Sequence, residues 1–119
     1  MSRVLVVDDE VEICLLVTQY LKKLGYDTSF CLSIAEAAKK IAAAPYDLIF
    51  VDLNLRDGSG YDLMKALHKS KSSTKVIVIS AYDSERQKAL QKGASFFLAK
   101  PFTKQSIDDS LQKINFLTK

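Results

Sequence analysis

The chain has 119 residues, 48% of them apolar and 26% charged, with a formal net charge of +3 at pH 7. This predicts a single α/β domain over residues 1–119, large enough to bury a core without disulfides. No apolar stretch reaches the roughly 20 residues of a membrane-spanning helix, and the apolar run behind Arg3 is too short for a signal peptide. We therefore expect a cytoplasmic protein in which Cys14 and Cys31 are core thiols, not a disulfide. Because Lys and Arg never occur three in a row, we predict no direct nucleic-acid binding by this domain.

Short apolar runs alternate with amphipathic segments along the chain. In chain order the patterns predict a strand at 4–7, a helix at 11–24, a strand at 28–31, a helix from 34 to before Pro45, a strand at 48–51, a helix at 60–69, a strand at 76–79, a helix from 84 to 93, a strand at 96–98 and a helix after Thr103. Strands apolar on both faces suit a parallel sheet buried under helices. With right-handed crossovers, the expected fold is a three-layer α/β/α sandwich of five strands and five helices.

Individual residues indicate where these helices begin and end. Gly25 ends the first helix. The segments 33–36 and 84–87 each have the form of a capping box, and Thr103 can cap the last helix. The apolar stripes predicted for the first and last helices are Val11, Cys14, Val17, Leu21 and Leu24, and Ile107, Leu111, Ile114 and Leu117.

Polar side chains follow four of the predicted strands. Asp8 and Asp9 follow the first, Asp52 the third and Ser80 the fourth, and Lys100 comes one residue after the apolar run of the fifth. In an open parallel sheet, ligands bind beyond the carboxyl ends of the strands. We therefore expect these five residues to converge at one edge of the sheet.

Three carboxylates brought together repel one another, by roughly 4 kcal/mol for two charges about 4 Å apart at an effective dielectric near 20. Such a site favours a cation, and a few hard oxygen ligands with room for water suit Mg²⁺. Ser80 supplies a hydrogen-bond donor and Lys100 a mobile positive charge, both suited to phosphoryl oxygens. A carboxylate nucleophile, a divalent cation and a lysine together indicate a phosphoryl acceptor. Taken singly, Asp8 and Asp9 could cap a helix, and Lys100 could be a surface lysine.

The sequence resembles the receiver domain of two-component response regulators over essentially its whole length. The supporting residues are Val-Val-Asp8-Asp9-Glu10, Tyr46-Asp47-Leu48-Ile49 leading to Asp52, Asp57-Gly58-Ser59-Gly60, Ser80-Ala81, Gly93-Ala94 and Lys100-Pro101-Phe102. Each is weak alone, but in this order they are specific. The resemblance implies a flavodoxin-like sheet with strand order 2-1-3-4-5.

The resemblance also implies a role for each site residue. Asp52 would accept the phosphoryl group, and Asp8, Asp9, Asp52 and the backbone carbonyl of Asn54 would hold Mg²⁺. Ser80 would move toward the phosphoryl group, Lys100 would pair with it, and the Lys100–Pro101 peptide would be cis. Phe97 occupies the switch aromatic position, where many relatives carry Tyr, so it could respond only by moving between packed and exposed positions.

By the same resemblance, the donor would be a sensor histidine kinase or a histidine phosphotransfer protein. The domain would not act on a separate substrate but would catalyse its own phosphorylation and dephosphorylation. The surface of the fourth and fifth helices and the fifth strand would then control a protein target or an output domain, and dimerisation on phosphorylation is left open. Two alternatives remain: a docking module read without phosphorylation, and a phosphatase resembling the haloacid dehalogenase superfamily. Whether the chain is a stand-alone regulator or part of a longer one also stays open.

Overall fold

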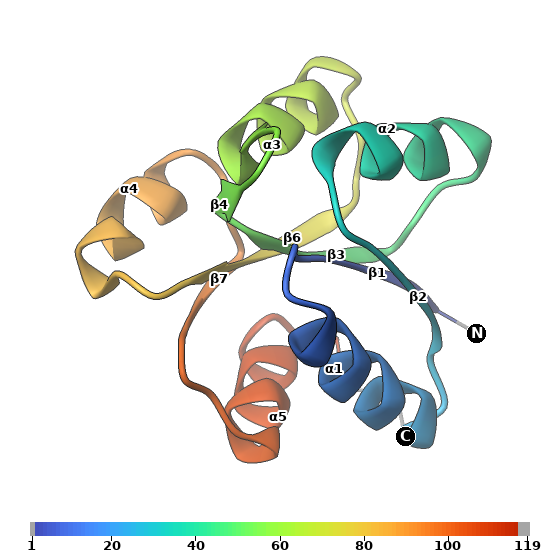
Figure 1. Cartoon of the computed structure of the whole chain (residues 1–119), viewed down its shortest axis with the longest axis vertical. Coiled ribbons are helices and arrows are strands. Elements are labelled where there is room, and N and C mark those ends of the chain that lie inside the picture. The colour runs from blue at the N-terminus through green and yellow to red at the C-terminus, as the bar shows by residue number, and fades with distance from the viewer. Residues whose placement is uncertain (1, 117–119) are drawn as a thin grey trace.

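The sheet has five parallel strands in the order β2-β1-β3-β6-β7, which corresponds to the predicted 2-1-3-4-5 order (Figure 1). The computed structural model describes residues 2–116, so Leu117 of the predicted last stripe lies outside the described residues. The strands of this sheet are β1 (Arg3–Val7), β2 (Asp27–Cys31), β3 (Leu48–Asp52), β6 (Lys75–Ser80) and β7 (Phe96–Ala99). The helices are α1 (Val11–Lys23), α2 (Ile34–Ala43), α3 (Gly60–Lys69), α4 (Arg86–Gln91), α5 (Lys104–Lys113) and the short 3₁₀ helix η1 (Asp83–Glu85).

Helices cover both faces of the sheet, as predicted: α1 and α5 pack on one face, and α2, α3 and α4 on the other (Figure 1). Alternate residues of each strand point to opposite faces. In β3, Leu48 and Phe50 face the α1–α5 layer, whereas Ile49 and Val51 face the α2–α4 layer. All four are fully buried, which explains why the strand is apolar without alternation. No helix described here, within residues 2–116, is long and apolar enough to cross a membrane.

The first helix buries a narrower stripe than predicted. Cys14, Val17 and Leu21 are buried, but Val11 and Leu24 are more than 40% exposed. These two residues lie at the ends of α1, beyond the part of the helix that rests on the sheet, so helical spacing alone overestimated the buried face. Gly25 does follow the end of α1 and has a φ of +99°, a conformation that glycine adopts without strain.

The caps are partly as predicted. Ser33 caps α2 by accepting from the Glu36 backbone N–H, although the Glu36 carboxylate accepts from Leu32 instead of completing the box on Ser33. Thr103 caps α5 as predicted. The capping box at Ser84 was wrong. The chain already turns into η1 at Asp83, so Ser84 lies inside a helical turn instead of in the extended conformation that a capping residue needs.

A small antiparallel pair, β4 (Asn54–Leu55) and β5 (Gly58–Ser59), follows β3 and was not predicted. Asp57, between its strands, accepts hydrogen bonds from the backbone N–H groups of Ile34 and Ala35 at 3.0 and 3.1 Å. These bonds lower the pKa of Asp57 and tie the loop after β3 to the first turn of α2. Ser59 then caps α3 in a capping box with Asp62.

Candidate functional site

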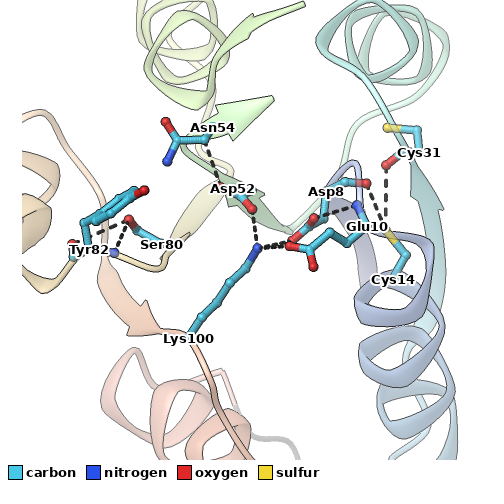
Figure 2. A network of polar contacts seen from close by, with 9 residues as sticks. All are labelled: Asp8, Glu10, Cys14, Cys31, Asp52, Asn54, Ser80, Tyr82 and Lys100. Carbon is cyan, nitrogen blue, oxygen red and sulfur yellow. Dashed lines mark hydrogen bonds and ion pairs between the residues drawn. The ribbon is translucent and has the colours of Figure 1, made fainter. Parts of the chain in front are cut away.

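The polar residues predicted to converge do lie along one edge of the sheet: Figure 2 shows Asp8, Asp52, Ser80 and Lys100, and Asp9 has a carboxylate oxygen within 4.8 Å of those of Asp8 and Asp52. Asp8 follows β1 directly and Asp52 is the last residue of β3, and the two strands are paired with Val7 opposite Val51. Ser80 ends β6 and pairs with Ala99 of β7, so Lys100 follows immediately beside it. The parallel register therefore brings together residues that are up to 92 positions apart.

Lys100 is the centre of the cluster. Its Nζ donates to Asp52 Oδ2 at 2.5 Å and to Glu10 Oε2 at 2.7 Å, and lies 3.3 Å from Asp8 Oδ2. Burial disfavours the charged ammonium, but the hydrogen bonds to Asp52 and Glu10 outweigh that effect and raise the pKa of Lys100. The side chain therefore stays positively charged throughout the physiological pH range.

Asp8 is fully buried, and its two carboxylate oxygens have different surroundings. Oδ1 accepts from the backbone N–H of Glu10 at 2.9 Å, whereas Oδ2 has no hydrogen-bond partner. Among the residues the structure describes, the only other buried side-chain N or O atom without a hydrogen-bond partner is the Thr18 hydroxyl oxygen. Burial, together with the negative charge of Asp52, raises the pKa of Asp8 to about 6, despite the opposing Glu10 bond and Lys100 charge. Asp8 Oδ2 therefore faces the Lys100 ammonium in an ion pair at 3.3 Å but makes no hydrogen bond, which leaves it able to ligate a metal ion.

The oxygens needed for a divalent metal are present. One carboxylate oxygen from each of Asp8, Asp9, Glu10 and Asp52 lies within 4.8 Å of the others. Such an all-oxygen set, partly open to water, fits Mg²⁺. The other oxygen of Asp52, Oδ1, accepts from the backbone N–H of Asn54 at 2.8 Å, which fixes the carboxylate orientation.

Gly60 determines how closely α3 approaches Asp52. A Cβ at position 60 would lie 2.5 Å from the backbone oxygen of Asp52, closer than real contacts allow. The Gly60 N–H also donates to the Leu53 carbonyl, and the Leu53 N–H donates to that of Ile79. The absence of a side chain at Gly60 therefore lets the start of α3 close on the end of β3 and hold Asp52 in place.

Ser80 is at the predicted strand end, but its hydroxyl is engaged elsewhere. Ser80 Oγ accepts from the backbone N–H of Tyr82 at 3.0 Å, and no hydrogen bond found among residues 2–116 joins it to Asp52 or Lys100 (Figure 2). The two strand ends are connected through the backbone instead, because the Lys100 N–H donates to the Ser80 carbonyl at 2.8 Å. The structure thus brings Asp8, Asp52 and Lys100 into contact and leaves the Ser80 hydroxyl outside that contact.

Phe97 is buried, with 2% of its surface exposed, and packs against the α2–α4 layer. The guanidinium of Arg86, at the start of α4, lies over its ring at 4.8 Å from the centroid. The Lys100–Pro101 peptide bond is cis, as expected. In this structure the aromatic side chain is therefore in its packed position.

Glu10 belongs to the first motif but had no predicted role, although it makes the second-shortest contact to Lys100 Nζ. The signal available in the sequence was its place two residues after Asp8, on the segment that connects β1 to α1.

Cys14 lies beneath the same segment, and its Sγ donates to the Asp8 carbonyl at 3.2 Å. Cys14 and Cys31 are both buried and free, which agrees with the prediction that they are core thiols. Burial raises the pKa of Cys14 to about 12.

Comparisons with known proteins match both the sequence and the fold of this chain. Residues 4–112 match the family model described as the response regulator receiver domain. The response regulator protein PilR of Pseudomonas aeruginosa is 38% identical over 102 residues, which cover 84% of this chain and 23% of PilR. The chain spans less than half the length of the curated relatives that it matches, for example 48% in one case and 10% in another.

Two solved structures show the same fold. The chemotaxis response regulator CheY4 of Vibrio cholerae superposes with a TM-score of 0.89 at 27% identity, over 96% of this chain and 98% of that one. The response regulator protein TrrA of Thermotoga maritima, solved in complex with Mg²⁺-BeF, has a TM-score of 0.86 at 30% identity, over 96% of this chain and 99% of that one.

Proposed function

Because this chain belongs to the response regulator receiver domain family, we propose that it is a phosphoacceptor switch in which Asp52 receives the phosphoryl group. The donor is a sensor histidine kinase or a histidine phosphotransfer protein. The observation that carries the proposal is the contact between the Asp52 carboxylate and the Lys100 ammonium, beside the buried Asp8 carboxylate, whose Oδ2 makes no hydrogen bond.

Phosphoryl transfer uses both partners of that contact. A carboxylate oxygen of Asp52 forms a bond to phosphorus while the bond from phosphorus to the donor's imidazole nitrogen breaks, and the imidazole leaves with the electron pair. The Asn54 N–H orients the carboxylate, and the Lys100 ammonium stabilises the negative phosphoryl oxygens. The raised pKa of Lys100 ensures that this charge is present.

Asp8, Asp9 and Asp52, with the backbone carbonyl of Asn54, are the residues that would hold Mg²⁺. When bound, the metal supplies positive charge that neutralises the phosphoryl oxygens and the clustered carboxylates. The acidic cluster of this chain, together with a 30% identical structural relative, TrrA, that was solved with Mg²⁺-BeF, supports a Mg²⁺ site here.

The output is a rearrangement of Ser80 and Phe97. Ser80 Oγ gives up its bond from the Tyr82 N–H and turns to the phosphoryl group, which leaves space for Phe97 to shift and alters the surface of α4, β7 and α5. Shifting the ratio of active to inactive conformation from 1:99 to 99:1 needs about 5.5 kcal/mol of interaction energy that favours the active conformation. A few charge-assisted hydrogen bonds, at roughly 1.5–3 kcal/mol each, are sufficient. That surface then controls a protein target or an output domain elsewhere in a longer chain.

The phosphatase alternative requires its nucleophile at the end of the first strand. Asp52 ends the third strand, β3, which argues against a phosphatase. The remaining alternative is a docking module that binds its partner without being phosphorylated, and the experiment must distinguish it from the switch. The test is to incubate the protein with acetyl phosphate and Mg²⁺ and record the intact mass. We expect a gain of one HPO₃ group that is lost in Asp52→Asn and in EDTA. An unmodified wild-type mass, with fold and Mg²⁺ binding intact, would favour the docking module.

A further inference from the structure

Glu10 is a second carboxylate partner of Lys100, next to Asp52. Its Oε2 accepts from Lys100 Nζ at 2.7 Å, and its backbone N–H donates to Asp8 Oδ1 (Figure 2). Glu10 precedes α1 directly, whereas Lys100 follows β7, so this ion pair joins two segments that are 90 residues apart. The side chain of Glu10 is 56% exposed.

A phosphoryl group on Asp52 creates a conflict for Lys100. The ammonium donates hydrogen bonds to Asp52 and Glu10 and lies 3.3 Å from Asp8 Oδ2, so three carboxylates already share its positive charge. Phosphoryl oxygens at Asp52 need the same ammonium. Unless one carboxylate gives up its contact, the phosphoryl group shares the positive charge of Lys100 with all of them.

Glu10 is the carboxylate that is able to leave. Asp8 is fully buried and anchored by a backbone N–H, and Asp52 carries the phosphoryl group itself. Glu10 is half exposed, so water can replace the ammonium around its carboxylate. It also lines, with Lys100, an open cavity of about 410 Å³ between α1 and the segment after β7, so the Glu10 carboxylate has room to move off the ammonium.

We propose that Glu10 is a positioning residue that competes with phosphoryl oxygens for Lys100 and disfavours small anionic phosphodonors at Asp52. This inference rests on the proposed function. An exposed ion pair of this kind changes an equilibrium by up to about fivefold, and salt weakens it. Removing the charge of Glu10 while keeping the shape of the side chain is therefore expected to favour the phosphorylated state by a similar factor.

The test compares the full chain with Glu10→Gln and with Glu12→Gln. Glu12 is a matched control because it is an exposed acid two residues away that does not contact Lys100. Labelling of Asp52 by acetyl phosphate with Mg²⁺ is followed by intact mass, and binding of Mg²⁺-beryllofluoride, a phosphoryl mimic, is followed by NMR. We expect Glu10→Gln to be labelled up to about fivefold faster and to bind beryllofluoride more tightly, with a gain that shrinks as salt is added.

Glu12→Gln is expected to behave as the wild type in both measurements. Glu10→Gln rates and beryllofluoride affinities equal to those of Glu12→Gln would overturn the proposal, as would a gain that salt does not change. If the wild type is not labelled at all, the proposed function fails, and beryllofluoride binding still compares the two variants. Glu10→Ala provides a second variant that should give the same ranking.

Discussion

Asp8 is expected to destabilise the metal-free protein at neutral pH, and replacing it with Asn should therefore raise stability. The side chain is fully buried, and its pKa rises from the ordinary value of 3.8 to about 6, mainly because burial disfavours the charge. At about 1.36 kcal/mol for each pH unit, that difference corresponds to about 3 kcal/mol at pH 7. Asn keeps the shape of the side chain and removes the charge.

The sign of the pH dependence follows from linkage. The folded state binds the Asp8 proton more tightly than the unfolded state, so the full destabilisation is present above pH 6 and disappears as the pH falls from about 6 to about 4. We therefore expect metal-free Asp8→Asn to exceed the wild type in free energy of unfolding by up to about 3 kcal/mol at pH 7. Near pH 4, where Asp8 is protonated, the two proteins should have similar stability.

Urea unfolding in EDTA at pH 7 and pH 4 measures this difference. Asp9→Asn is the control, because it removes an acid from the adjacent position that does not pair with Lys100, and it should gain less. Adding Mg²⁺ should stabilise the wild type more than Asp8→Asn, since a ligand that binds only the folded state raises its stability. If Asp8→Asn is no more stable than the wild type in EDTA at pH 7, or keeps its full advantage at pH 4, the electrostatic reasoning is wrong.

Two further predictions concern the residues around Asp52. Lys100→Met leaves Asp8 and Asp52 buried without their cation. We therefore expect the free energy of unfolding in metal-free urea titrations to fall by about 3 kcal/mol or more, and labelling by acetyl phosphate to be slower. Unchanged stability would show that the ion pairs contribute nothing. Gly60→Ala places a Cβ against the Asp52 backbone oxygen, and we expect a cost of about 1–3 kcal/mol in thermal or urea unfolding with a reduced labelling rate. Wild-type values for both would mean that the start of α3 moves away freely.

The sequence alone was sufficient for the five strands of the parallel sheet, for most helix boundaries and for the edge on which the site lies, but not for the β4–β5 pair. Runs such as 48–51 are apolar at every position because helices cover both faces of the sheet, and the structure buries each of these residues completely. Since parallel strands place their carboxyl ends together, Asp8, Asp52 and Lys100 could be grouped without any knowledge of distances. Local chemistry also located the Ser33 and Thr103 caps.

Features that depend on which atoms meet across the fold were decided only by the tertiary structure. Ser84 fitted a capping pattern, but the turn at Asp83 had already begun a helix. Val11 and Leu24 fitted the apolar stripe, but α1 rests on the sheet only through its middle. The carboxylate of Glu10 reaches Lys100 because the two residues come close only after the strands have paired. The Ser80 hydroxyl bonds the nearby Tyr82 N–H and not Lys100, a choice that the strand-end pattern did not predict. Sequence patterns report periodicity and local hydrogen bonding, which act over a few residues, whereas these contacts join segments as much as 90 residues apart.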